Sequence, residues 1–424
     1  MIALLLSLVW AAGDEPKSKI SLPPETQRIV DLARSTAPEI FADAVVRLIQ
    51  AGRVPQPGSQ IELLGQAFAA AGHAKEPVRL IALPATPPDT RELYRARAGD
   101  LGLDALSLES RVLRELATLN PVHARELFDT IPRPALDPRP CEDPLIADAA
   151  TYYEAAAVIA QSSFSREERH AEAHIQFLSA ILSGARSPGE LAPFARSLDS
   201  ISLEPAEWEV IAAAFAARLN SIGADYRAFA LSFESLQSEI RAMEHISHSP
   251  DLDQAFRKFA VAQLTAPRCT PDLSISPEMQ LEPKETAPTA RLGDFKTSDP
   301  YLSGTPIGDL LLHLTRDSAF DGFLHQYDSW TPTGDNLDAL HQRATALGAM
   351  MQFLQPGDDR DRVTQLAAEM LAASSAQQTN PAEWMWQTRH LIELAAGDAP
   401  KLLAAFRASG DPALGVYASL RSAP

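Results

Sequence analysis

The sequence predicts an all-α protein, and three observations lead to that class. About one residue in six is alanine, which favours helix, and long β-branched runs are absent. Apolar residues recur at spacings of three and four, which places them on one face of a helix. Many of the 33 prolines stand where a helix should begin, a position at which the N–H that proline lacks has no intrahelical partner.

Length and composition limit the class further. The chain has 424 residues, 46% of them hydrophobic and 22% charged, with a formal net charge of −18. A single core rarely grows past about 300 residues, so we expect more than one domain. The composition excludes disordered, collagen-like and disulfide-dense proteins. The acidic balance excludes nucleic acid as a partner, because phosphate binding requires a basic face, and no motif requires a cofactor.

Residues 1–13 have the form of a signal peptide. The apolar run from Ile2 to Ala12 is too short to span a bilayer, which needs about 20 residues, and small residues for cleavage follow it. No Lys or Arg precedes the run, so the amine of Met1 would supply the charge; a buried first helix is the alternative. No other segment is long and apolar enough to cross a membrane. We therefore expect an extracytoplasmic protein, periplasmic or secreted, without stable membrane insertion.

Residues 14–264 are expected to form a helical-repeat-like domain of short helices joined by tight turns. Residues 105–119 and 208–222 each place an apolar stripe on one helix face. Helix pairs such as 103–119 and 121–131 favour an irregular helical-hairpin array, similar to an α-solenoid. An irregular bundle remains the alternative, because no fixed repeat period is found. Helix starts are predicted at Pro38, Pro121, Pro188, Pro205 and Pro381.

Two proline-rich stretches interrupt this rhythm. Residues 131–144 are expected to form an extended loop, and residues 265–305 a linker. The linker separates the first domain from a smaller C-terminal helical domain, residues 306–424. That domain carries an aromatic stripe from Phe320 to Trp330. No alternating strand and no hairpin turn is evident.

The sharpest candidate for chemistry is a histidine pair. His170 and His174 are spaced to share a helix face, where they could bind a metal ion. The zinc-protease pattern places a glutamate directly after the first histidine, whereas Glu172 comes two residues after it. His174 also continues an apolar stripe through Phe177, which favours a histidine at the edge of the core. We therefore predict no metal here and keep a metal-binding protein as an alternative.

The other polar clusters are expected to interact with the helix dipole at helix ends. His245 and His248 stand at the end of one helix, and Asp358, Asp359 and Asp361 at the start of another, where the helix dipole favours each charge. Phosphate-loop, dinucleotide-binding and hydrolase-elbow motifs are absent from the sequence. No catalytic residue can be named.

The tryptophans suggest a binding surface. Trp330, Trp384 and Trp386 lie in the C-terminal part. On a helix, side chains two residues apart point about 200° from each other, so one core cannot receive both Trp384 and Trp386. Either one of them packs against a second neighbouring element, or it meets solvent as a contact for peptide or glycan.

The two cysteines, Cys141 and Cys269, are predicted to form a disulfide. Both lie in proline-flanked loops of similar local sequence, and neither is on an apolar helix face. An even cysteine count in an exported protein favours pairing, because the environment is oxidising. The bridge would hold the start of the linker against the 131–144 loop.

These observations favour an exported helical scaffold that binds a protein or peptide partner without catalysis. Helical arrays offer extended surfaces, and no reaction centre is evident. The alternative is a secreted, α/α-toroid-like enzyme acting on polysaccharide, although its cleft would need more aromatic residues than 7 Tyr and 5 Trp. Two carboxylates facing each other in a deep aromatic cleft would favour that enzyme.

Overall fold

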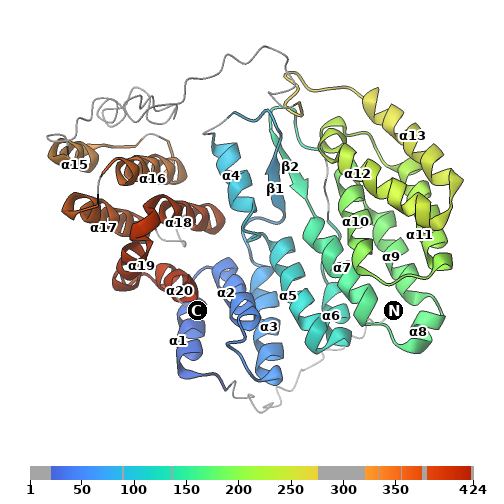
Figure 1. Cartoon of the computed structure of the whole chain (residues 1–424), viewed down its shortest axis with the longest axis horizontal. Coiled ribbons are helices and arrows are strands. Elements are labelled where there is room, and N and C mark those ends of the chain that lie inside the picture. The colour runs from blue at the N-terminus through green and yellow to red at the C-terminus, as the bar shows by residue number, and fades with distance from the viewer. Residues whose placement is uncertain are drawn as a thin grey trace, which may run out of the picture.

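The computed structural model is mostly helical, which confirms the all-α class (Figure 1). It describes residues 21–87, 90–134, 136, 138–275, 320–332, 334–354, 356–374 and 380–421. The signal peptide predicted over residues 1–13 and most of the predicted linker lie outside these residues. No helix within them is long and apolar enough to span a membrane.

The helices of the first part lie side by side, largely in chain order (Figure 1). Helix α2 packs on α3, α3 on α5, α5 on α7, α7 on α9 and α10, and α11 on α12 and α13. The solenoid-like arrangement stays a prediction. The helices are α1 (Pro24–Arg34), α2 (Pro38–Gln50), α3 (Pro57–Ala71), α4 (Arg91–Gly99), α5 (Ala105–Leu119), α6 (Pro121–Phe128), α7 (Ala150–Ser162), α8 (Arg166–His170), α9 (Ala173–Gly184), α10 (Leu191–Ser197), α11 (Pro205–Ser221), α12 (Tyr226–Ser247) and α13 (Pro250–Leu264).

The last helices return to the first ones. Helix α18 packs on α4, and α20 packs on α1 and α2, on the side of the molecule away from α12 and α13 (Figure 1). One continuous apolar core therefore runs from Ile29 in α1 to Ala418 in α20. The helices of this part are α15 (Phe320–Ser329), α16 (Asn336–Phe353), α17 (Asp358–Ala373), α18 (Pro381–Ala395), α19 (Ala399–Ala408) and α20 (Pro412–Arg421).

Local sequence explains where these helices begin. Pro38, Pro121, Pro205 and Pro381 are each the first residue of a helix, as predicted, and Pro188 opens the short 3₁₀ turn before α10. The predicted apolar face of α5 is buried. Burial of such faces supplies most of the stability of short helices, which are marginal in isolation.

Two short strands were not predicted. β1 (Arg79–Ala82) pairs antiparallel with β2 (Leu145–Asp148), and Arg79 forms an ion pair of 3.3 Å with Asp148 across the pair. Four residues are too few for a periodicity of two to stand out, and 62 residues separate the strands, so no turn motif marks the pair.

Cys141 and Cys269 form the predicted disulfide, with their Cα atoms 5.3 Å apart. The guanidinium of Arg227 in α12 is buried beneath this loop and donates to the carbonyl oxygens of Arg139 and Asp143, each at 2.7 Å. Four residues after Cys269, the carbonyl of Leu273 accepts a hydrogen bond from the backbone of Ala85. The bridge thus holds the chain that leaves α13 against the middle of the molecule.

The carboxyl group of Glu109 in α5 makes stability depend on pH. Burial, reinforced by the negative charge of Asp104, raises the pKa of Glu109 from 4.5 to about 7. Between these values the folded state keeps a proton that the unfolded state releases, so stability should fall as the pH rises. Glu109→Gln should remove this fall and raise the melting temperature above pH 7. Glu209→Gln, at an exposed site in α11, is the control; identical melting profiles for both variants would contradict the assignment.

Candidate functional site

The first and last of the described helices meet at a surface that we call the seam. It is formed by α16, α18 and α20 on one side and by α1, α2 and α4 on the other. Ion pairs and hydrogen bonds cross from the C-terminal part to the first part. Arg91 at the start of α4 pairs with Asp335 before α16 at 2.6 Å, and Asn380 donates to Glu76 at 3.0 Å. Residues about 240 and 300 positions apart are therefore joined here.

A buried aromatic and polar cluster fills one section of the seam. The ring of His341 is fully buried and stacks on Tyr94 of α4 with a centroid distance of 4.2 Å. Its Nε2 lies 3.0 Å from Oε2 of Glu383, and Gln387 donates to its Nδ1. These partners place the ring proton on Nε2, because Nδ1 accepts. His341, Glu383 and Gln387 are each at most 2% exposed, so this buried cluster fixes the C-terminal helices onto α4.

A small pocket opens at the other section of the seam. Its volume is about 90 Å³, and its polar side chains come from three helices: α2, α18 and α20. Its apolar wall is formed by Ile40, Leu101, Leu103, Met385, Val416 and Leu420, and its polar lining by Asp43, Arg47, Arg389, Tyr417 and Arg421. We call this cavity the seam pocket.

Positive charge dominates the seam pocket. Asp43 is the one acid in the lining, and it is already bound by Arg47 at 2.6 Å and by Arg111 at 2.7 Å. Arg389 pairs with Glu393 one turn later in α18, at 2.8 Å. The pocket and the partners of its charged groups include four arginines (Arg47, Arg111, Arg389, Arg421) and two carboxylates (Asp43, Glu393). This balance leaves the site positive, in a chain whose net charge is −18.

The hydroxyl of Tyr417 is the unsatisfied group in this pocket. Tyr417 is 8% exposed; the guanidinium of Arg421 lies close enough to donate to its hydroxyl oxygen, and no hydrogen bond of normal geometry uses the hydroxyl proton. Burial raises the pKa of Tyr417, and the charge and hydrogen bond of Arg421, together with the charges of Arg389 and Arg47, oppose that rise. A buried hydroxyl whose proton has no acceptor destabilises the folded state, so a ligand that accepts this proton would remove the cost.

These residues are suited to holding an anion. Guanidinium groups bind carboxylate or phosphate through paired hydrogen bonds, and apolar walls hold an attached aliphatic group. The lining offers no Ser, Cys or His to act as nucleophile or base, and Asp43 is occupied by its arginines. The two opposing carboxylates that glycoside hydrolysis requires are likewise not part of this lining.

The three predicted tryptophans are embedded in packing. Trp384 is fully buried, and its Nε1 donates to the carbonyl of Leu371; Trp330 is 8% exposed. Trp386 is half-buried between Tyr94 of α4 and His390, whose ring is stacked on it at 5.2 Å. Trp386 thus packs against a second element, α4, and a binding surface at these tryptophans stays a prediction.

His170 and His174 do not share a helix, which corrects that expectation. Helix α8 ends at His170, and Glu172 adopts a left-handed conformation (φ 56°) before α9 begins at Ala173. His170 is exposed, whereas His174 is buried with its Nε2 2.9 Å from Oε1 of Glu207. In the part of the chain that the structure describes, no three His, Cys, Asp or Glu side chains are grouped to hold a metal ion.

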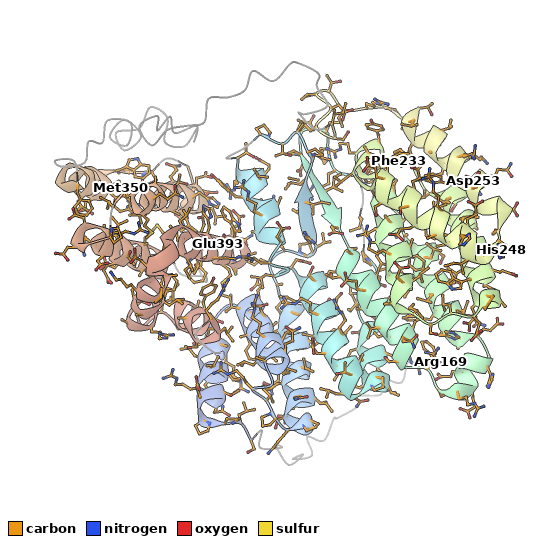
Figure 2. The ribbon with its side chains drawn as sticks, viewed as in Figure 1. Arg169, Phe233, His248, Asp253, Met350 and Glu393 are labelled. Carbon is orange, nitrogen blue, oxygen red and sulfur yellow. A yellow bond between two sulfur atoms is a disulfide. The ribbon has the colours of Figure 1, made fainter. Side chains whose placement is uncertain are left out.

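The remaining polar clusters lie at helix ends. His248 follows the last residue of α12, at the end of the molecule opposite the seam (Figure 2). Asp358, Asp359 and Asp361 form the first turn of α17, and Asp361 pairs with Lys401.

The seam pocket could not be found from the sequence. Arg389 and Arg421 are 342 and 374 residues from Arg47, and each of the three resembles an ordinary surface residue.

Comparison of the chain with protein families, with curated proteins and with solved structures finds no match.

Proposed function

We propose that the protein is an exported, non-catalytic helical scaffold whose protein or peptide partner docks an anionic group in the seam pocket. The observation that carries this proposal is the convergence of Arg47, Arg389 and Arg421 on one apolar-walled pocket. In a chain of net charge −18, an anionic group would be repelled by most of the surface and attracted here.

An extracytoplasmic location is part of the proposal. The disulfide between Cys141 and Cys269 is compatible with it, because such bonds persist in oxidising compartments. The polar lining of the pocket, in which arginines and a tyrosine surround an already paired Asp43, supports the binding of an anionic group. N-terminal sequencing of the protein recovered outside the cytoplasm should show cleavage near residue 13.

Site-specific photo-crosslinking tests the docking site. A photoreactive amino acid in place of Leu420, at the pocket wall, should give an adduct with the partner in the extracytoplasmic fraction of the source organism. The adduct should disappear when the labelled protein also carries the substitution Arg389→Glu. The same label in place of Val261, which is exposed in α13, is the control. Equal adducts from both sites, or an adduct that Arg389→Glu leaves intact, would contradict the proposal.

A further inference from the structure

We infer that the group bound in the seam pocket is the C-terminal carboxylate of a peptide chain whose last side chain is aliphatic. This inference rests on the proposed function and specifies the chemistry of its ligand. It depends on three features of the pocket: its charge, its size and its unsatisfied hydroxyl.

The charge and geometry favour a carboxylate. Arg47 and Arg389 have side chains that are 50% and 48% exposed, so their guanidinium groups keep donors free beside the one bond that each makes to an acid. A guanidinium has five N–H donors, and two of them can bind the two oxygens of one carboxylate side by side. The hydroxyl of Tyr417 would supply a further donor from within the pocket.

The small volume of the seam pocket indicates that it binds only the end of a larger molecule. Pockets that enclose a whole drug-sized ligand measure about 300–1,000 Å³. The seam pocket, at about 90 Å³, admits a carboxylate and one short aliphatic group, and the rest of the ligand must extend outside. Its walls are aliphatic, including Ile40, Leu103 and Val416, which suits a leucine-like side chain. A chain terminus provides the acid and the side chain on one carbon atom.

Calorimetry with three small probes tests the chemistry on the full-length oxidised protein. The probes are acetyl-alanyl-leucine, its C-terminal amide, and hexanoate, a free carboxylate with an aliphatic tail. We expect the peptide acid to bind, and the amide to bind at least about 10-fold more weakly, because it loses the charge-assisted bonds. Hexanoate should also bind more weakly, because it lacks the peptide group outside the pocket.

Two variants connect the binding to named residues. Arg389→Ala should weaken binding of the peptide acid about 10-fold with little change in melting temperature, since Arg389 makes a surface ion pair. Arg257→Ala removes the same type of pair, Arg257 with Asp253 in α13, and should change neither quantity. Asp253 lies near the right edge of the molecule in Figure 2, well away from Glu393 in the left half. Tyr417→Phe should weaken binding while the melting temperature of the free protein is kept or raised, a combination that a purely structural tyrosine would not give.

The outcomes separate this inference from the proposed function. Equal binding of acid and amide, no binding of the peptide acid, or unchanged binding by Arg389→Ala would overturn the carboxylate assignment. Hexanoate binding as tightly as the peptide would overturn the peptide assignment. In each case the Leu420 adduct still tests the docking function, because crosslinking requires no particular ligand chemistry.

Discussion

Loss of the disulfide between Cys141 and Cys269 should lower the free energy of unfolding by about 4–5 kcal/mol. The bridge closes a loop of 128 residues, and the chain-entropy model assigns a loop of this length about that value. Chemical denaturation of the oxidised protein and of the variant with Cys141→Ser and Cys269→Ser measures the difference. The midpoint for the variant should lie at clearly lower denaturant concentration.

The presence of the disulfide in the starting protein must be verified separately. Titration of thiols in denatured, unreduced protein should find none, since both cysteines are bridged. Arg227 and the backbone bond between Leu273 and Ala85 still hold the two segments in the variant, so it should fold at low denaturant. Two reactive thiols per chain, or superimposable unfolding curves, would contradict this role of the bridge.

Replacing Glu383 with alanine should detach the C-terminal helices from α4 more easily. The variant leaves the Nε2–H of His341 buried without its acceptor, and removal of one partner from such a pair costs about 3 kcal/mol. Tryptophan fluorescence during denaturation is a suitable probe, because Trp384 and Trp386 lie in α18 and Trp330 directly follows α15. The fluorescence transition of the Glu383→Ala variant should occur at a lower denaturant concentration than that of the unmodified protein.

Two further variants make the Glu383 result interpretable. Glu383→Gln keeps an acceptor oxygen for His341, so most of the stability should return. Glu369→Ala removes an acid that is 52% exposed in α17 and should have little effect. A loss of similar size for Glu369→Ala and Glu383→Ala would show that the buried pair has no special part in the seam.

Features set by neighbouring residues could be predicted from the sequence. Helix starts at prolines such as Pro121 and Pro205 depend on φ and on one missing N–H, both local properties. The apolar face of α5 follows from its periodicity. The disulfide could be predicted because only two cysteines exist, so a long-range contact had a single possible pairing.

Features that depend on the tertiary fold could not be predicted in this way. The helix breaks between His170 and His174 at Glu172, which adopts the left-handed conformation. No proline or glycine stands there, so the sequence does not mark the break. The seam pocket joins α2 to α18 and α20, and nothing local to Arg47 or Arg389 indicates that they meet. Trp386 packs against Tyr94, a residue nearly 300 positions earlier, and nothing local to Trp386 indicates this contact.

A crystal structure of the full-length oxidised protein with acetyl-alanyl-leucine would test the central claim most directly. The account predicts the peptide carboxylate in the seam pocket, about 2.7–2.9 Å from a guanidinium nitrogen of Arg389 and of at least one other pocket arginine. Its leucine side chain should lie against Ile40 and Val416. A peptide bound elsewhere, or a seam pocket without peptide at a saturating concentration, would contradict the account.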